Sequence, residues 1–517
     1  MKCLLTIALL AIFTFTLALP AIADEQQIRS QVRVYFNRDV NIGSLVAMDS
    51  LTACGYQVGP NYADIIILPE EVEALRSRGC QLEILEENID DQLKEYREKG
   101  NLGVYRSVVQ VEELLQSYQA SHPEITKLES IGTSWEDRNI WALKISDNPE
   151  EDENEPACLF MGAHHAREWI AYEAPLALID TLLAGYGSDE TITTLINERE
   201  IWIVPIVNPD GVNHSQTEYS MWRKNRRNNS ETVKWWGSGS KFGVDLNRNY
   251  AYAWGNTGAS DYTGSDVYHG PNPFSEPESS AIRDLALREN FTTSISFHSY
   301  SELVLYPFGY AYDVPNEKDP IFKELAEGMA EFSGYTPQNS ADLYPAAGDS
   351  EDWLYGEAGV FSFTFELGTR FVPSDNQVPK ICKDNVGSSI WLLERAADLV
   401  EERTQHIAEL QSYLNSILKP SATESRELTR EEKQEYMRMI KLRNIHRNKL
   451  VEEILGDRNL DKAKNFTEIL KELPANLQPV YIPAINEIIG AIKTLGLGRD
   501  DSEQLIGDLL EISALSR

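Results

Sequence analysis

Residues 157–168 read Ala-Cys-Leu-Phe-Met-Gly-Ala-His-His-Ala-Arg-Glu, an uninterrupted apolar run followed by a histidine and a carboxylate three residues apart. Such a run is typical of a strand that is buried on both faces of a parallel sheet. A turn after this strand brings residues i and i+3 to the same side, so His165 and Glu168 can both reach one Zn²⁺ at roughly 2.0–2.2 Å. We expect the adjacent His164 to point elsewhere, because consecutive residues at a strand end face different directions. Taken alone, the H-x-x-E spacing is common and establishes no metal site.

Two later segments end in the same way. An apolar strand at Thr293–Phe297 is followed by His298, and another at Val360–Phe365 is followed by Glu366. In open α/β sheets, ligands bind beyond the carboxyl ends of the strands. We therefore expect His298 to complete a three-ligand zinc site that leaves a fourth position for water. Glu366 would then lie at the same edge of the sheet, as a candidate base for that water.

The composition indicates a globular protein and excludes two classes of function. Of the 517 residues, 42% are hydrophobic and 25% are charged, which is enough apolar material for about two to four domains. The 47 Lys and Arg residues stand against 81 Asp and Glu residues, giving a formal net charge of −34. Phosphate backbones and anionic lipids repel such a chain, so we expect no nucleic-acid partner and no membrane partner after signal removal.

The first hundred residues have three parts. Residues 1–23 have the charge, apolar core and A-x-A end of a secretory signal peptide, which predicts a secreted protein, either extracellular or periplasmic. An uncleaved membrane anchor is the alternative, although the apolar run is shorter than the roughly 20 residues that span a bilayer. Residues 32–85 follow the order strand, helix (42–54), two strands, helix and strand, which predicts a small split βαβ (ferredoxin-like) domain. A charged linker, residues 86–99, then offers Arg97 and Lys99 to a trypsin-like protease.

The remaining chain falls into two regions. From Val104 to about Glu402, apolar strands alternate with amphipathic helices, which predicts an α/β domain. Residues 405–517 have helical spacing and no strand signal, which predicts a helical C-terminal domain of unknown role. Further elements of the α/β domain are expected at Glu200–Val207 (strand) and at Glu168–Ala184, Pro320–Phe332 and Gln377–Glu402 (helices).

Eight motifs follow one another along the α/β domain: His-Ala-Arg-Glu168, Asn208-Pro-Asp-Gly211, Trp222-Arg-Lys224, Asp245-Leu-Asn-Arg-Asn249, His298-Ser-Tyr300, Tyr306-Pro-Phe-Gly-Tyr310, Asp342-Leu-Tyr344 and Phe363-Thr-Phe-Glu366. In this order they resemble the zinc metallocarboxypeptidases of the pancreatic A/B type, most closely the secreted bacterial members of the carboxypeptidase T type. The resemblance covers essentially all of residues 104–402. It implies a mixed, mostly parallel central sheet flanked by helices, with one Zn²⁺ per chain.

The resemblance also implies a role for each matched residue. His165, Glu168 and His298 bind the zinc ion, and Glu366 takes the proton of the attacking water and later gives it to the leaving amine. The other implied roles are oxyanion stabilisation by Arg223, binding of the substrate carboxylate by Asn247 and Arg248, closure over the substrate by Tyr344, and a substrate-side contact by Arg167. Without the resemblance, Arg223 would be interpreted as a surface arginine of a basic run.

Substrate preference depends on the segment that the resemblance aligns with the floor of the specificity pocket, Tyr344-Pro-Ala-Ala-Gly-Asp349-Ser-Glu351-Asp352-Trp353. The position of Glu351 is apolar in relatives that prefer large apolar residues and acidic in those that prefer Lys or Arg. Asp349 resembles the acidic residue of carboxypeptidase T, which accepts both kinds. We therefore expect a broad or basic preference; the alternative is that one carboxylate faces solvent or pairs with a local cation.

Together these features predict the zymogen of a secreted zinc exopeptidase that hydrolyses the C-terminal residue of peptides and proteins. Its expected parts are a signal peptide (1–23), an inhibitory propeptide (24–99), a catalytic domain (100–404) and the helical region (405–517). Its expected partners are substrates with a free C-terminus and an activating protease. A cell-wall or γ-glutamyl peptide hydrolase on the same scaffold, or an inactive binding module, is the alternative. Calcium is implied only by the resemblance to carboxypeptidase T.

The five cysteines are too few for a disulfide framework, and signal cleavage would remove Cys3. For Cys54 and Cys80, the sequence allows either a disulfide between them or two free thiols. Cys158 lies in the strand before the zinc motif and is expected to be a small buried hydrophobe rather than a nucleophile. The sequence does not decide the state of Cys382.

Overall fold

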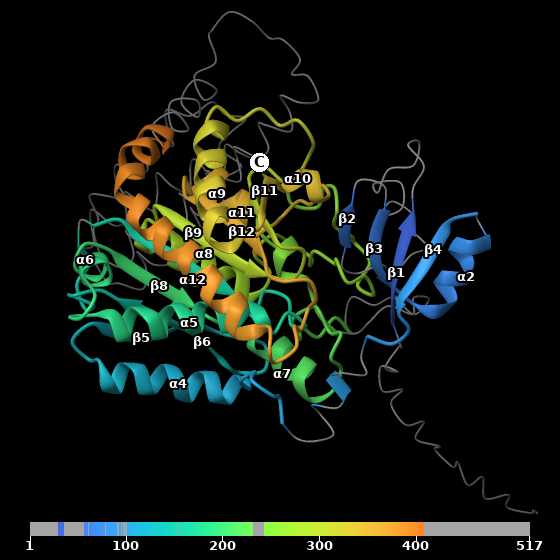
Figure 1. Cartoon of the computed structure of the whole chain (residues 1–517), viewed down its shortest axis with the longest axis horizontal. Coiled ribbons are helices and arrows are strands. Elements are labelled where there is room, and N and C mark those ends of the chain that lie inside the picture. Colours follow the sequence, from blue (N-terminus) through green and yellow to red (C-terminus); the bar gives the residue numbers. More distant parts are fainter. Residues whose placement is uncertain are drawn as a thin grey trace, which may run out of the picture. The chain divides into compact units, whose positions relative to one another are not determined.

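The structure is a computed structural model that describes residues 29–35, 56–59, 62–77, 79–89, 93–94, 96, 101–153, 155–230 and 242–407. Two compact units divide the chain, Met1–Gly100 and Asn101–Arg517, and Figure 1 shows their elements. Several predictions lie outside the described residues: the signal peptide, the helix at 42–54 with Cys54, the cleavage points Arg97 and Lys99, and the C-terminal region beyond Ile407.

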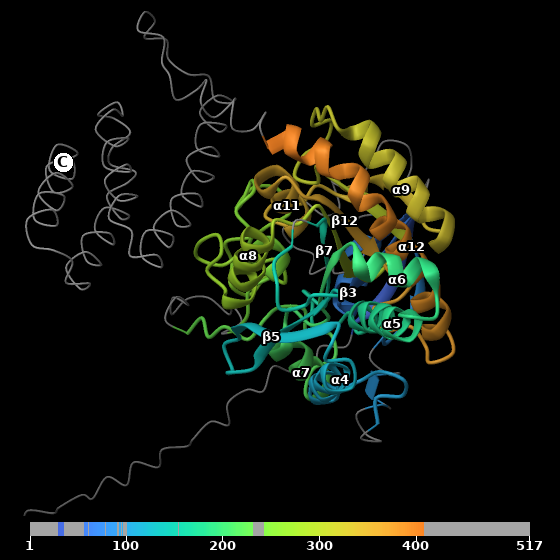
Figure 2. The ribbon, with the colours of Figure 1, turned by 90° about the vertical axis from the view of Figure 1, so that its left-hand side faces the viewer.

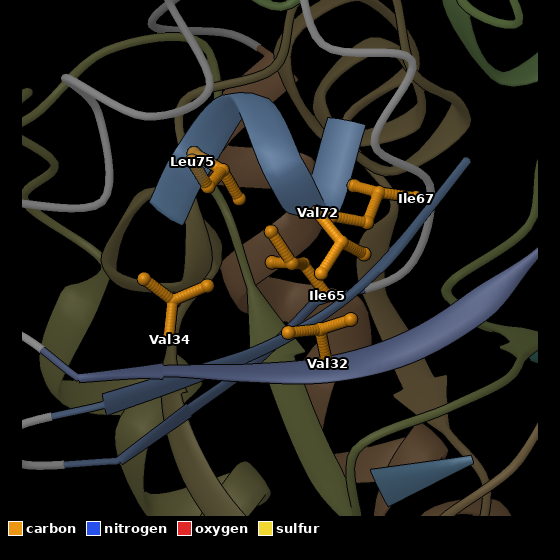
Figure 3. Close-up of a cluster of buried hydrophobic side chains, with 6 residues drawn as sticks. All are labelled: Val32, Val34, Ile65, Ile67, Val72 and Leu75. Carbon is orange, nitrogen blue, oxygen red and sulfur yellow. The ribbon is translucent and has the colours of Figure 1, made fainter. Parts of the chain in front are cut away.

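The first unit contains a four-stranded antiparallel sheet with the strand order β2-β3-β1-β4. This is the order of a split βαβ domain, as the sequence predicted. Alternate apolar residues of two strands face one helix and form the buried core shown in Figure 3, which consists of Val32, Val34, Ile65, Ile67, Val72 and Leu75. Cys80 is a free thiol. The elements are β1 (Ser30–Tyr35), β2 (Tyr56–Gly59), β3 (Tyr62–Ile67), α2 (Pro69–Ser77) and β4 (Gln81–Glu86).

The second unit is built on an eight-stranded sheet with the order β11-β10-β12-β9-β7-β8-β6-β5. Four strand pairs are parallel (β7 with β8, β7 with β9, β9 with β12, and β10 with β11), and three are antiparallel. The predicted mixed, mostly parallel sheet is therefore confirmed. The strands are β5 (Thr126–Thr133), β6 (Asn139–Ile145), β7 (Ala157–Gly162), β8 (Glu200–Val204), β9 (Thr293–His298), β10 (Leu303–Tyr306), β11 (Thr336–Asn339) and β12 (Phe361–Glu366).

Helices cover both faces of this sheet. Figure 2 shows α5, α9 and α12 on one side and α8 and α11 on the other. Helical turns continue after α12 through Ile407, the last described residue. The helices are α4 (Val108–Ser121), α5 (Ile170–Gly185), α6 (Glu190–Asn197), α7 (Pro209–Thr217), α8 (Pro277–Glu289), α9 (Asp319–Ser333), α10 (Ser340–Leu343), α11 (Ser350–Ala358), α12 (Val378–Arg395), with the 3₁₀ turns η1 (Leu246–Arg248) and η2 (Ala396–Leu399).

Two predicted boundaries, the end of one strand and the start of one helix, were wrong. The strand expected to reach Val207 ends at Val204, because Pro205 has no backbone N–H to continue the ladder. The helix expected from Glu168 begins at Ile170, so Glu168 lies in the turn between β7 and α5. The carboxyl ends of the parallel strands β7, β9 and β12 meet at one edge of the sheet, where the candidate ligands were expected.

Candidate active site

The ends of β7 and β9 bring His165, Glu168 and His298 together. All three are buried, and their ligand atoms lie within 4.8 Å of one another. The Nδ1 atom of His165 lies 2.8 Å from Glu168 Oε1, and His298 Nδ1 lies 3.0 Å from Glu168 Oε2. The two Nδ1 atoms are 3.1 Å apart. Two imidazole nitrogens and a carboxylate that converge on one point form a donor set that fits a catalytic zinc ion.

The turn that carries the first two ligands depends on a close backbone approach. A Cβ atom added to Gly162 would lie 2.1 Å from the carbonyl oxygen of Ala171, so only glycine fits at the end of β7. Ala163 has φ +53, in the left-handed region. Asn208, from the loop before α7, donates from Nδ2 to the carbonyl oxygen of His164 at 3.0 Å and holds the turn in place.

Asp245, for which the sequence alone predicts no role, connects the candidate metal ligands to the arginine beside them. Its Oδ1 atom lies 3.2 Å from His165 Nε2, on the far side of that ring from Glu168. Its Oδ2 atom accepts hydrogen bonds from Arg223 Nε at 3.0 Å and lies 2.9 Å from Arg223 Nη2. Burial opposes ionisation of Asp245, but the charges of Arg223 and His165 outweigh it and hold its pKa well below the ordinary value. A carboxylate behind a ligand histidine fixes the orientation of its ring.

Arg223 and Glu366 lie beside the candidate metal ligands. The Nη1 atom of Arg223 is 3.2 Å from His165 Nδ1 and 3.8 Å from Glu168 Oε1. Glu366 ends β12 directly opposite His298 in the parallel register with β9, so both residues occupy the same edge. Burial, and then the charge of Glu168, raise the pKa of Glu366 well above its ordinary value, against the opposing charge of Arg223. A bound cation would favour the charged form of this carboxyl group.

A pocket of about 420 Å³, measured with its open mouth, adjoins Glu366. Asn247 Oδ1 accepts from the backbone N–H of Ser350 at 2.9 Å, which directs its Nδ2 donors away from α11. The Nε and Nη1 atoms of Arg248 donate to the carbonyl oxygens of Gly258 and Asn247, which fixes the guanidinium plane. The lining residues are Asn247, Arg248, Leu305, Gly309, Ser340, Leu343, Tyr344, Ala346, Asp349, Glu351, Thr364 and Glu366. Six of the predicted site residues therefore line one cavity.

Arg167 does not belong to this lining. It is 1% exposed, lies 3.2 Å from Asp266 through Nη1, and stacks its guanidinium on the ring of Phe371 at 4.4 Å. His164, as expected, lies outside the ligand group: its ring stacks on His298 and its Nε2 is 2.8 Å from the hydroxyl of Tyr250. Burial, and then the neighbouring histidines, lower the pKa of His164 well below its ordinary value, so it is neutral.

Both cysteines of the second unit, Cys158 and Cys382, are unreactive. Cys158 is fully buried in β7, and burial raises the pKa of its thiol to about 11. Cys382, which the sequence left undecided, is a buried free thiol in α12 whose pKa burial raises to about 12. Thiols with such pKa values are protonated at neutral pH and are poor nucleophiles.

A mixed α/β sheet with a His-Glu-His group at the carboxyl edge of its parallel strands defines a class of zinc peptidase. The chain belongs to the zinc carboxypeptidase family, whose sequence model matches residues 111–388. It is similar to a zinc carboxypeptidase of Saccharothrix mutabilis subsp. capreolus, with 35% identity over 346 residues that cover 61% of this chain and 77% of that protein. It is also similar to carboxypeptidase B of Astacus astacus, with 32% identity over 287 residues (53% of this chain and 91% of that protein).

Solved structures show the same fold. A carboxypeptidase A from Helicoverpa armigera superimposes with a TM-score of 0.64 at 24% identity, over 72% of this chain and 98% of that chain. Thrombin activatable fibrinolysis inhibitor superimposes with a TM-score of 0.62 at 24% identity, over 72% of this chain and 100% of that chain. The family match, and not these likenesses, makes the protein a zinc metallocarboxypeptidase. Within the described part of the chain, no helix has both the length and the apolar character needed to cross a bilayer.

Proposed function

We propose that this enzyme removes the last residue of peptides and proteins that end in a free carboxylate, and that it accepts Lys and Arg at least as well as large apolar residues. One observation carries the proposal: the pocket beside Glu366 is lined by a guanidinium, an amide and two buried carboxyl groups, those of Asp349 and Glu351. The Glu351 Oε2 atom is buried and has no hydrogen-bond partner among the described residues. A buried acceptor without a donor favours a ligand that brings one.

The proposed reaction assigns one task to each group. His165, Glu168 and His298 would hold the zinc ion, which would supply a lower pKa to a bound water and polarisation of the scissile carbonyl. Glu366 holds the proton taken from the water and delivers it to the leaving amine. Arg223 donates to the oxygen that becomes negative. Asn247 and Arg248 hold the terminal carboxylate, which fixes the scissile bond relative to Glu366, and Tyr344 donates a hydrogen bond as it closes over the substrate.

Preference is tested with two blocked dipeptides that differ only in the C-terminal residue, Arg or Phe. We expect a ratio of kcat/KM (Arg over Phe) of one or more at pH 8 to 8.5, because one charge pair in the pocket supplies about tenfold or more. Glu351→Ile should move the ratio toward Phe. A wild-type ratio far below one in this pH range would show that the carboxyl groups do not contact the substrate side chain.

We also propose that the protein is a secreted zymogen in which residues 24–99 keep the enzyme inactive until cleavage near Arg97 or Lys99. The split βαβ fold of the first unit supports this assignment. The likeness to thrombin activatable fibrinolysis inhibitor covers 72% of this chain. Residues 101–407 make up only 307 of the 517 residues, or 59%, so the likeness extends beyond them. Activity and fragment masses should be followed during limited trypsin digestion of the full chain. Equal activity before and after digestion would contradict the zymogen proposal.

Calcium is proposed for three carboxyl groups near β7, Asp147, Glu153 and Glu155, whose oxygen atoms lie within 4.8 Å of one another. Burial, and then the charge of Glu153, raise the pKa of Glu155 to about 7, so a hard cation would relieve repulsion there. Added Ca²⁺ should raise the Tm of the wild type but not of Glu155→Gln. An equal effect on both proteins would exclude this cluster.

A further inference from the structure

The carboxyl group of Glu351 lies between three elements. It stands in the first turn of α11, is 3% exposed, and lines the pocket. Its Oε1 atom is hydrogen-bonded to the hydroxyl of Ser340, the first residue of α10. The same hydroxyl oxygen lies 3.1 Å from the carbonyl oxygen of Tyr306, the last residue of β10.

The Ser340 hydroxyl has one proton for these two neighbours. The Tyr306 carbonyl can only accept; it also accepts from Asn339 Nδ2 at 3.3 Å, and a carbonyl oxygen has two lone pairs. If Ser340 donates to Tyr306, then Ser340 must accept from Glu351, and only a protonated carboxyl group can donate. If instead Ser340 donates to an ionised Glu351, two acceptor oxygens face each other at 3.1 Å. The Ser340 hydroxyl therefore satisfies both of its neighbours when Glu351 is neutral.

The charged groups around Glu351 favour the same state. Asp349 and Asp352 lie on its own helix end, Glu366 lies on β12, and all three are acids that line or adjoin the pocket. Arg248, on η1, is the one cation among the lining residues, and two of its nitrogens are already held by backbone carbonyls. Tyr344 is the remaining titratable group of the lining.

These surroundings change the acidity of the pocket. Burial, and then the charge of Asp349, raise the pKa of Glu351 to about 8; a proton donated by Ser340 to the carboxylate would oppose this rise, but Ser340 gives its proton to Tyr306. Burial also raises the pKa of Asp349 to about 6, against the backbone N–H of Asp352 and the charge of Arg248. Both effects follow from removing carboxylates from water without a paired cation.

We propose that Glu351 is a protonated acid in the empty pocket at neutral pH and releases its proton to solvent when a Lys or Arg side chain enters, whereas an apolar side chain enters beside the neutral acid. The inference rests on the proposed function and specifies how one pocket serves two classes of substrate. The proton balance is simple: the carboxyl group loses H⁺ to water and the incoming cation becomes its counter-ion. The pH then sets the preference between basic and apolar C-terminal residues.

The sign of the effect follows from the proton balance. Below the pKa of Glu351, binding of a cation must displace a proton. The value of kcat/KM for a C-terminal Arg should therefore fall by up to about tenfold for each unit by which the pH is lowered. Above that pKa the carboxylate is already charged, and the dependence should level off. A C-terminal Phe needs no proton release in the pocket. The ratio of the two constants should therefore rise with pH.

The experiment measures that ratio from pH 5.5 to 9 on the activated holoenzyme. Because both substrates use the same metal, base and carboxylate clamp, the pH dependence of those groups cancels in the ratio. We expect a rise of tenfold or more between pH 6 and pH 8.5. A substrate ending in citrulline, which has the shape of Arg without its charge, should give a flat ratio to Phe.

Two variants and one binding measurement complete the test. Glu351→Gln should abolish the rise above pH 7, and Ser340→Ala should move its midpoint to lower pH, because the neutral acid loses its acceptor. Titration of the wild type with free arginine in buffers of different ionisation enthalpy should show proton release near pH 7. A flat Arg-to-Phe ratio above one would overturn the proton exchange while leaving the basic preference intact. A ratio below one at every pH would instead overturn the proposed function.

Discussion

Replacing Asp245 with Asn tests whether one buried carboxylate holds the catalytic groups in place. The amide keeps Oδ1, which lies near His165 and accepts from the backbone N–H of Asn247 at 3.0 Å. It replaces Oδ2 with an NH₂ group that faces the Nε and Nη2 donors of Arg223. One charge-assisted hydrogen bond of about 1.5–3 kcal/mol and the ion pair of Nη2 at 2.9 Å are lost, while the longer ion pair of Arg223 with Glu168, at 3.8 Å, remains.

The loss should appear in metal binding as well as in stability. We expect the free energy of unfolding to fall by about 3–5 kcal/mol and zinc affinity to fall about 10–100-fold, because a neutral amide oxygen orients the ring of His165 less firmly than a carboxylate does. The assays are zinc competition with a chromophoric chelator, denaturant unfolding, and kcat/KM for a blocked dipeptide at saturating zinc. Lower kcat/KM at full zinc occupancy would report the misplacement of Arg223.

Asp210→Asn provides the matched control. Asp210 is also fully buried and bound to an arginine: it accepts from Arg138 Nη1 and Ser134 Oγ, both at 2.7 Å, and from the backbone N–H of Glu136. It touches none of the metal ligands. This variant should lose comparable stability but keep wild-type zinc affinity. If both variants bound zinc equally well, the orienting role of Asp245 would be refuted.

Three further outcomes are expected. Glu366→Gln should keep its zinc content and fold but lose about 10²–10⁴-fold in kcat, and wild-type turnover would exclude it as the base. Gly162→Ala should lower the free energy of unfolding by about 1–3 kcal/mol and weaken zinc binding, because its Cβ atom would collide with the Ala171 carbonyl; unchanged zinc affinity would contradict this. The peptide bond after Arg106 should resist trypsin, because the backbone of Arg106 is held on both sides. The N–H of Arg106 donates to Glu173, and its carbonyl oxygen accepts from the Tyr172 hydroxyl and the Gln216 amide. Mass spectrometry should show this bond intact in the wild type and cleaved in Glu173→Gln.

The sequence predicted the fold and the ligand group because both depend on local patterns. A buried strand is a continuous apolar run, and a polar residue directly after it must lie at the sheet edge, which is how His298 and Glu366 were found. The role of Asp245 depends on a contact with His165 across 80 positions of the chain, and no spacing rule encodes such a contact. The motif around Asp245 was noticed, and its placement before Asn247 and Arg248 was the available signal.

The direction in which a side chain points was a second feature that could not be predicted from the sequence. Arg167 occupies the zinc motif, yet whether its guanidinium faces substrate or a ring such as Phe371 depends on how a distant loop folds back. The shared proton of Ser340 and Glu351 is hidden for the same reason, since β10, α10 and α11 meet only in the folded sheet. Chain breaks were predictable in principle: Pro205 should have ended the strand after Val204.

The order of the strands along the chain has a consequence for biosynthesis. His165 and Glu168 follow β7, His298 ends β9, and Glu366 ends β12, the last strand of the sheet to leave the ribosome. A growing or prematurely terminated chain that stops between residues 299 and 365 carries the three candidate metal ligands but lacks the proposed base. Because Glu366 takes its place only by pairing β12 with β9, the proposed base joins the site after the three candidate metal ligands have been synthesised. Translation products that end before Glu366 should therefore be unable to hydrolyse the proteins around them.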